Sequence, residues 1–192
     1  MNKVDVVLIY PPTEFVDNLK QDLHNYRINN KKVGVWPPLG LLYLSAVLDK
    51  KNISSRVIDA FVLGLSLEQI IKEIARYSPK IVGISVTTLQ IRGAVQLGEA
   101  IKRQFKNVKI IIGGPHISVD NNFVRQFKCF DVGITGEAEI SFVKVVEKIL
   151  NNMKVPKMVF GELPLDLDAL PFPSREKIKI KDYFDVEKPM CE

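Results

Sequence analysis

Five short apolar segments, separated by stretches with the spacing of amphipathic helices, constrain the fold of this chain most. The expected strands are 4–10, 55–58, 81–86, 108–112 and 131–135. The stretches between them are long enough for helices, which we expect at 39–51, from Ser66 onward, at 91–105, near 119–127 and at 138–150. Strands that alternate with helices of this length are joined by crossovers, and crossovers require parallel pairing.

The pattern predicts an α/β domain of the flavodoxin-like (Rossmann-like) kind. We expect a doubly wound five-stranded parallel sheet, with helices on both faces and strand order 2-1-3-4-5. Continuous apolar strands such as VKIIIGG suit a sheet that is covered on both faces. This domain takes up residues 1–150. Residues 151–192 contain several prolines and only short apolar stretches, so we expect a strap or linker there and a chain that is part of a longer protein.

Composition narrows the possible surroundings and partners. No window of eighteen apolar residues occurs, so we expect no membrane span. Cys129 and Cys191 are too few for a disulfide framework, which favours the cytoplasm. The formal net charge is +5, but the lysines are scattered and no arginine-rich stripe appears, so we expect no nucleic-acid partner.

Small and polar residues stand where the predicted strands end. In an open parallel sheet, ligands bind beyond the carboxyl ends of the strands. This edge holds Tyr10, Pro11, Pro12, Asp59, Ser85, Thr87, Thr88, Gly113, Gly114, Pro115, His116, Thr135, Gly136 and Glu137. The chain lacks the motifs of several other ligand sites of such sheets. These are the acidic residues of a phosphoacceptor domain, the dinucleotide-binding motif G-x-G-x-x-G, the P-loop and the phosphate loop of flavodoxins.

Taken singly, these residues leave two interpretations open. The hydroxyls of Ser85, Thr87 and Thr88 suit either a cap of the next helix or a ligand. Gly113–Gly114 suits either a tight turn or a ligand lying against the backbone. His116 suits a structural hydrogen bond, and the helix dipole favours an acidic residue at Glu137 whatever its function.

Taken together, the segments VIDAFVLGLS, PKIVGISVTT, VKIIIGGPHIS and DVGITGEAE closely resemble the cobalamin-binding domain that precedes the radical domain in radical S-adenosylmethionine enzymes. PPLGLLYLSAVL resembles the first helix of that family, and LDALPFPSRE resembles its linker into the radical domain. The resemblance implies that the chain binds cobalamin. It also implies that Ser85, Thr87, Thr88, Gly113 and Gly114 line the slot for the nucleotide tail, and that the corrin is framed by Leu39, Gly40, Pro115, Gly136 and Glu137. We count His116, which follows Pro115, among the cofactor-binding residues as well.

The chain departs from many cobalamin proteins after the first strand. Those proteins carry D-x-H-x-x-G there, and its histidine ligates cobalt, whereas this chain has YPPTEF. The similar DAFVLG that begins at Asp59 follows the second strand, so we assign it no such role. Neither His24 nor His116 lies in a ligand motif. The resemblance therefore implies cobalamin held without an axial histidine from the protein.

The radical enzymes also need C-x-x-x-C-x-x-C for a 4Fe–4S cluster, and this chain lacks that motif. S-adenosylmethionine and the cluster are then expected only in a C-terminal radical domain that these residues do not include. We expect the chain alone not to be catalytic, and its parent to be a methyltransferase or an oxidoreductase that cyclises its substrate oxidatively.

Two other hypotheses stay open on the residues alone. One is a domain that keeps the fold but has lost the cofactor and serves as a scaffold or interaction domain. The other is a different ligand, such as a flavin, in the same crevice. We expect Gly114→Leu to abolish cobalamin binding while leaving folding nearly intact if the slot exists.

Overall fold

Apolar side chains point to both faces of the central strands, and each face is covered by helices. The computed structural model describes residues 3–13, 27–28, 31–32 and 36–184. In β1 (Val6–Tyr10), Val7 and Ile9 join the core on one face, while Val6 and Leu8 join the core on the other. Strands without a polar face can only be stable inside a sheet that is covered on both sides.

The main sheet is parallel throughout, with the order β4-β1-β5-β6-β7-β8 in the described residues. Its other strands are β4 (Ser55–Asp59), β5 (Ile81–Ser85), β6 (Lys109–Gly113), β7 (Val132–Thr135) and β8 (Met158–Phe160). A separate antiparallel pair is formed by β2 (Arg27–Ile28) and β3 (Lys31–Lys32). The predicted flavodoxin-like parallel sheet and the order of its first five strands are confirmed.

The predicted number of strands is wrong, because a sixth strand follows the expected five. β8 pairs with β7 in parallel, with Met158 opposite Gly133. It lies in the segment that the sequence assigned to a strap. Three residues at a half-exposed sheet edge are too few to show a periodic pattern, and Pro156 and Gly161 flank them closely.

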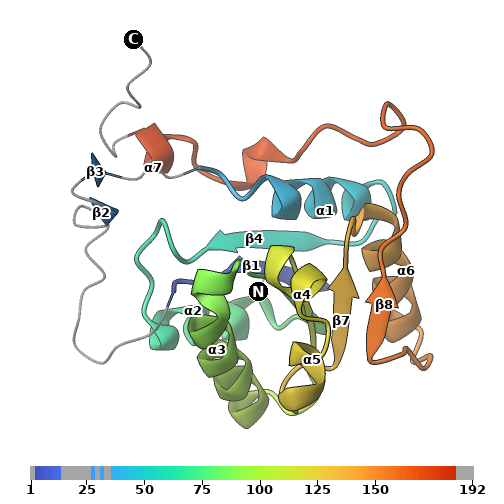
Figure 1. Cartoon of the computed structure of the whole chain (residues 1–192), viewed down its shortest axis with the longest axis horizontal. Coiled ribbons are helices and arrows are strands. Elements are labelled where there is room, and N and C mark those ends of the chain that lie inside the picture. The colour runs from blue at the N-terminus through green and yellow to red at the C-terminus, as the bar shows by residue number, and fades with distance from the viewer. Residues whose placement is uncertain (1–2, 14–26, 29–30, 33–35, 185–192) are drawn as a thin grey trace.

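The helices form one layer on each face of the sheet. Figure 1 shows α1 (Leu39–Asp49) and α6 (Glu139–Leu150) apart from α2 (Leu67–Tyr77) and α3 (Ile91–Gln104). The layer with α2 and α3 also holds α4 (Pro115–Val119) and α5 (Phe123–Gln126), which replace the single short helix expected near 119–127. Among the described helices, none combines the length and apolar character needed to cross a membrane.

The start of α2 follows from a local sequence signal. At α2, the Ser66 hydroxyl accepts a hydrogen bond from the Gln69 amide at 3.2 Å, and the Gln69 side chain accepts one from the Ser66 amide at 2.7 Å. This is the predicted capping box, and such a cap contributes about 0.5–2 kcal/mol.

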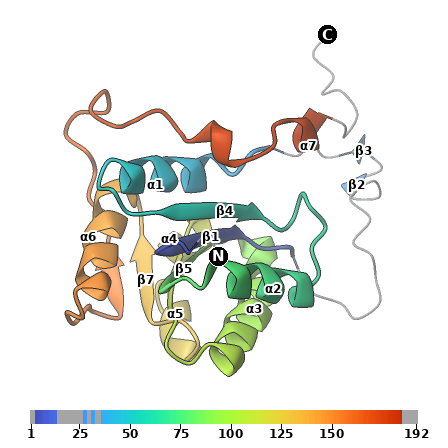
Figure 2. The same ribbon diagram turned by 180° about the vertical axis from the view of Figure 1, so that it is seen from behind.

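The chain crosses back over α1 after β8. We call residues 161–184 the crossing segment. Figures 1 and 2 both show it along the side of α1 that faces away from the sheet. The Lys50 ammonium donates to the Ala169 carbonyl at 2.8 Å, and Lys177 forms an ion pair with Asp49 at 2.7 Å. After a short turn, η3 (Arg175–Lys177), it ends in α7 (Lys181–Phe184), beside the carboxyl end of β4.

Candidate functional site

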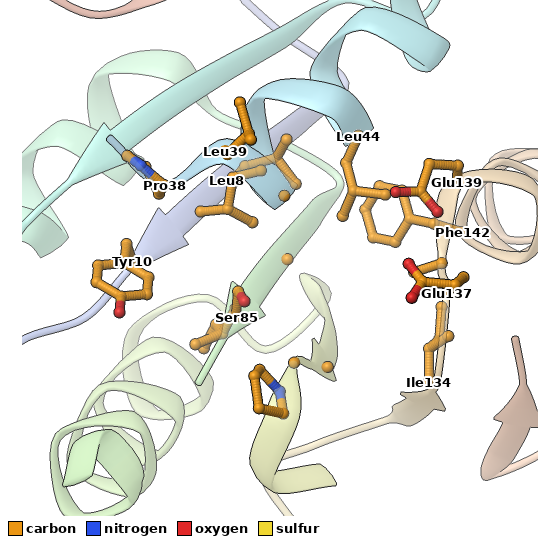
Figure 3. A pocket seen from close by; sticks show the side chains of 18 of the residues that line it. Leu8, Tyr10, Pro38, Leu39, Leu44, Ser85, Ile134, Glu137, Glu139 and Phe142 are labelled. Carbon is orange, nitrogen blue, oxygen red and sulfur yellow. The ribbon is translucent and has the colours of Figure 1, made fainter. Parts of the chain in front are cut away.

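A cavity of about 670 Å³ opens at the carboxyl edge of the sheet. It lies between the ends of the central strands and the first turns of α1 and α6, and Figure 3 shows it from Tyr10 and Pro38 on one side to Glu139 and Phe142 on the other. Its size falls within the range of about 300–1,000 Å³ for small-molecule sites. The lining residues are Leu8, Tyr10, Trp36, Pro37, Pro38, Leu39, Gly40, Leu41, Leu44, Gly83, Ile84, Ser85, Thr87, Ile111, Gly113, Gly114, Pro115, Ser118, Ile134, Gly136, Glu137, Ala138, Glu139 and Phe142.

The floor of the cavity depends on a glycine in the middle of the sheet. Gly83 pairs in register with Leu8 on one side and with Ile111 on the other. A Cβ atom added at Gly83 would lie 2.8 Å from Leu8 Cδ2 and 3.2 Å from Phe142 Cζ. A larger residue at this position would therefore occupy the space between the sheet and α6.

The Gly113–Gly114 turn brings the backbone close to the next strand. Gly114 has a φ of +101° and a ψ of −180°, a conformation that is essentially restricted to glycine. A Cβ atom there would lie 2.7 Å from both the amide nitrogen and the carbonyl oxygen of Val86. The expectation that Gly114→Leu leaves folding nearly intact is therefore wrong, because the side chain would collide with backbone atoms.

Thr87 does cap the turn that leads into α3. Its amide and its hydroxyl both lie 2.9 Å from Gln90 Oε1. The buried Gln90 side chain also donates to the Pro11 carbonyl at 2.8 Å, which ties the loop after β1 to this turn. Thr87 lines the cavity as well, so the two interpretations of this residue are compatible.

Nine of the eleven residues singled out from the sequence line this one cavity. They are Leu39, Gly40, Ser85, Thr87, Gly113, Gly114, Pro115, Gly136 and Glu137. Their strands and helices are far apart in sequence, but parallel pairing brings their ends to the same edge.

Thr88 and His116 do not line the cavity. His116 Nδ1 lies 3.3 Å from Thr88 Oγ1, and its ring packs edge-on against Phe123, with ring centroids 5.2 Å apart. Phe123 belongs to the core on the side of α2 and α3, whereas Leu8 and Phe142 of the cavity belong to the core on the other face of the sheet. His24 and Cys191, which the sequence analysis also considered, lie outside the described residues.

Sequence reasoning missed the apolar walls of the cavity and one acidic residue. Leu8, Ile111, Ile134 and Phe142 carry the same pattern as ordinary core residues, so nothing in the sequence marks them as lining a space. Glu139 could have been found from its place two residues after Glu137, in the first turn of α6.

Asp59 has a structural role at the edge of the sheet. It is 3% exposed, and its carboxylate accepts hydrogen bonds from the Val62 amide at 3.0 Å and from the Tyr183 hydroxyl at 2.8 Å. Burial raises the pKa of Asp59, while these hydrogen bonds act in the opposite direction. The carboxylate is thus already engaged within the chain, which agrees with giving the DAFVLG segment no axial role.

Residues 28–146 match the family model described as B12 binding domain, which covers more than half of the chain. The chain belongs to the B12-binding domain family. The order of its strands and the position of the cavity beyond their carboxyl ends are those expected of such a fold.

One curated relative of this B12-binding domain is the "Uncharacterized methyltransferase PH0819" of Pyrococcus horikoshii. The two are 26% identical over 198 residues, which cover 95% of this chain and 40% of the relative. The chain therefore spans less than half the length of that protein.

Solved structures of radical S-adenosylmethionine enzymes contain the same fold. The methyltransferase TsrM of Kitasatospora setae, with cobalamin and a 4Fe–4S cluster bound, gives a TM-score of 0.61 at 16% identity, over 80% of this chain and 26% of TsrM. TsrM with tryptophan and an S-adenosylmethionine analogue bound also gives a TM-score of 0.61, at 17% identity, over 78% of this chain and 26% of TsrM. The apo form of OxsB, a cobalamin-dependent S-adenosylmethionine radical enzyme, gives a TM-score of 0.54 at 21% identity, over 80% of this chain and 19% of OxsB.

Proposed function

We propose that this B12-binding domain holds cobalamin with its nucleotide tail in the cavity between the sheet and helices α1 and α6. The observation that carries the proposal is the cavity itself, which has a glycine floor and opens at the carboxyl edge of the sheet. An ordinary core of this fold has no reason to leave about 670 Å³ open at that place.

The residues present fit such a group. The apolar walls suit the flat benzimidazole base, and Gly113 and Gly114 let a ligand lie against the backbone. We assign the tail to Ser85, Thr87, Gly113 and Gly114, and the corrin to the residues at the mouth: Leu39, Gly40, Pro115, Gly136 and Glu137. The cofactor, when bound, supplies a cobalt centre that carries methyl groups or electrons, and the protein supplies burial and orientation.

We also infer that no histidine of the described residues ligates the cobalt. Two facts support this. His116 packs on the opposite layer against Phe123, and the D-x-H-x-x-G-like segment has Phe61 at the histidine position, with Asp59 bonded to Tyr183. Thr88, like His116, is not assigned to the cofactor site, since both lie outside the cavity lining.

We further propose that the chain works as the N-terminal part of a longer radical S-adenosylmethionine enzyme. Its relative is named as a methyltransferase and is more than twice as long. The crossing segment, which we expect to lead toward the radical domain, returns the chain to the edge of the sheet where the cavity opens. The partner domain would then supply S-adenosylmethionine and the cluster, for methyl transfer or oxidative cyclisation.

The test is a titration of the purified chain with hydroxocobalamin, followed by desalting and an absorption spectrum. We expect a retained cofactor with a base-off spectrum. A spectrum of histidine coordination would overturn the inference on the axial ligand. Folded protein that retains no cobalamin would favour the scaffold hypothesis, and the same titration of a longer chain that includes the C-terminal domain would decide it.

A substitution at Gly40 separates cofactor binding from folding better than one at Gly114 does. It lines the cavity from the first turn of α1, and a Cβ atom there would meet no other atom within 4 Å. Gly40→Leu should block cobalamin without loss of stability, because replacing a helical glycine gains up to about 1 kcal/mol. Gly40→Ala is the matched control, which gains the same helix stability but fills little of the cavity.

A further inference from the structure

Trp36 differs from the other aromatic residues of the cavity because it is open to solvent. It is the only tryptophan of the sequence, and it is 72% exposed. It also lines the cavity, next to Pro37 and Pro38. Among the large apolar side chains that are exposed in the described part of the chain, two line the cavity, Trp36 and Leu39. Exposure of an indole to water is unfavourable, and aromatic side chains are common in the walls of small-molecule sites.

The backbone restricts where Trp36 can lie. Pro37 favours an extended conformation of the residue before it, and each proline ring fixes its own φ. The Pro38 carbonyl accepts a hydrogen bond from the Leu42 amide at 3.2 Å, which joins this stretch to the first turn of α1. Figure 3 shows Pro38 and Leu39 where the chain enters α1 beside the cavity. A ligand that contacts Trp36 therefore meets a residue that has little backbone freedom left to lose.

The exposure of Trp36 indicates which part of a ligand it meets. Leu8 and Ile111 line the interior of the cavity and are 0% and 2% exposed, whereas Trp36 lies at the mouth. In the proposed function the nucleotide tail enters the cavity and the corrin stays at the mouth, beside Leu39. The corrin is a broad ring system, and an indole offers it a large, flat and rigid apolar surface.

We propose that Trp36 binds the corrin of cobalamin by packing its indole against the ring system. This inference rests on the proposed function and deepens it, because it adds a residue to the corrin side of the site. The contribution of Trp36 to affinity is then independent of the nucleotide tail.

The experiment titrates the wild-type chain, Trp36→Ala and Trp36→Phe with hydroxocobalamin and with cobinamide, which has the corrin but no nucleotide. We expect Trp36→Ala to weaken the binding of both ligands by the same factor, about 10- to 100-fold, because the contact lies on the part that they share. Trp36→Phe keeps a smaller aromatic ring and should lose less.

Phe172→Ala is the matched control. Phe172 is an aromatic residue of the crossing segment that is 93% exposed and does not line the cavity. Its removal should change either affinity by less than about threefold.

A direct readout of the contact comes from the indole itself. Because Trp36 is the only tryptophan, its indole N–H gives one signal in a proton–nitrogen correlation spectrum, and the loss of that signal in Trp36→Ala assigns it. Bound hydroxocobalamin should shift the signal, since the conjugated corrin would lie against the indole. An unshifted signal in protein that has bound the cofactor would overturn the proposal.

Stability provides a further readout. Because Trp36 is exposed in the free chain, the melting temperature of Trp36→Ala should stay within about 3 °C of the wild type. A fall well beyond that would show a structural role and overturn the proposal.

The outcomes separate this inference from the proposed function. If neither the wild-type chain nor a longer chain with the C-terminal domain binds cobalamin, the proposed function fails and this inference falls with it. If the wild type binds cobalamin and Trp36→Ala binds it equally well, only the assignment of Trp36 is overturned. A loss for cobalamin alone would also overturn it, because the indole would then meet the nucleotide tail.

Discussion

The hydroxyl of Tyr183 donates a hydrogen bond of 2.8 Å to Asp59 Oδ2, across 124 positions of sequence. Both side chains are buried, with exposures of 8% and 3%. The bond attaches the end of the crossing segment to the end of β4, at the same edge of the sheet as the cavity.

Tyr183→Phe should destabilise the chain by about 1–3 kcal/mol, because it leaves a buried carboxylate oxygen without its donor. Urea unfolding followed by circular dichroism measures this loss. Tyr43→Phe is the control, since Tyr43 is a half-buried tyrosine of α1 and has no comparable bond in the described residues. Equal stability of Tyr183→Phe and the wild type would show that the bond does not form in solution.

Tyr183 should also make the chain sensitive to alkali. Burial, and then the negative charge of Asp59, raise the pKa of Tyr183 above its usual value near 10. The folded chain therefore keeps this proton at a pH where the unfolded chain loses it. The stability that this tyrosine contributes is complete below pH 10 and falls above it, by at most about 1.4 kcal/mol per pH unit. The free energy of unfolding, measured at several pH values between 9 and about 11, should therefore fall less steeply with pH for Tyr183→Phe than for the wild type.

Gly83→Ala tests the floor of the cavity. The new methyl group would press on Leu8 and Phe142, so we expect a loss of about 1–3 kcal/mol and weaker cobalamin binding. Combining it with Leu8→Val should recover part of the loss, because the closest contact is with Leu8 Cδ2. Strictly additive effects of the two substitutions would argue against this contact.

Cys129 should react slowly with thiol reagents. It is 8% exposed, and burial, followed by the charge of Glu99, raises the pKa of its thiol to about 11. In a Cys191→Ser variant, where Cys129 is the remaining cysteine, about one thiol in a thousand is ionised at pH 8. We expect a slow reaction with an aromatic disulfide reagent, accelerated by urea. A complete reaction of the folded protein within seconds would contradict the burial of Cys129.

The sequence was sufficient for the parallel sheet because its strands are apolar on both faces, as Val6 to Ile9 illustrate. It was sufficient for most of the cavity edge because parallel strands bring Ser85, Gly113 and Gly136 to one place. It was insufficient for β8, which has three residues and is half exposed, so it shows no periodic pattern.

The direction of individual side chains could not be predicted in the same way. Thr87 and Thr88 are adjacent, yet only Thr87 lines the cavity, because the turn η2 (Thr88–Gln90) rotates the next side chain toward His116. The walls formed by Leu8 and Phe142 could not be separated from the core by pattern either. Whether an apolar side chain faces another side chain or a space depends on how α1 and α6 pack against the sheet, which the pattern of a single segment does not show.

Helix α1 lies between the cavity and the crossing segment. Its first turn forms part of the cavity wall, and its last turn binds the crossing segment through Asp49 and Lys50. The crossing segment also contacts the early part of α1 directly, because the Ser174 amide donates to the Leu42 carbonyl at 3.2 Å. By thermodynamic reciprocity, if releasing this segment from α1 changes the affinity for a ligand in the cavity, binding of that ligand changes the attachment of the segment by the same free energy.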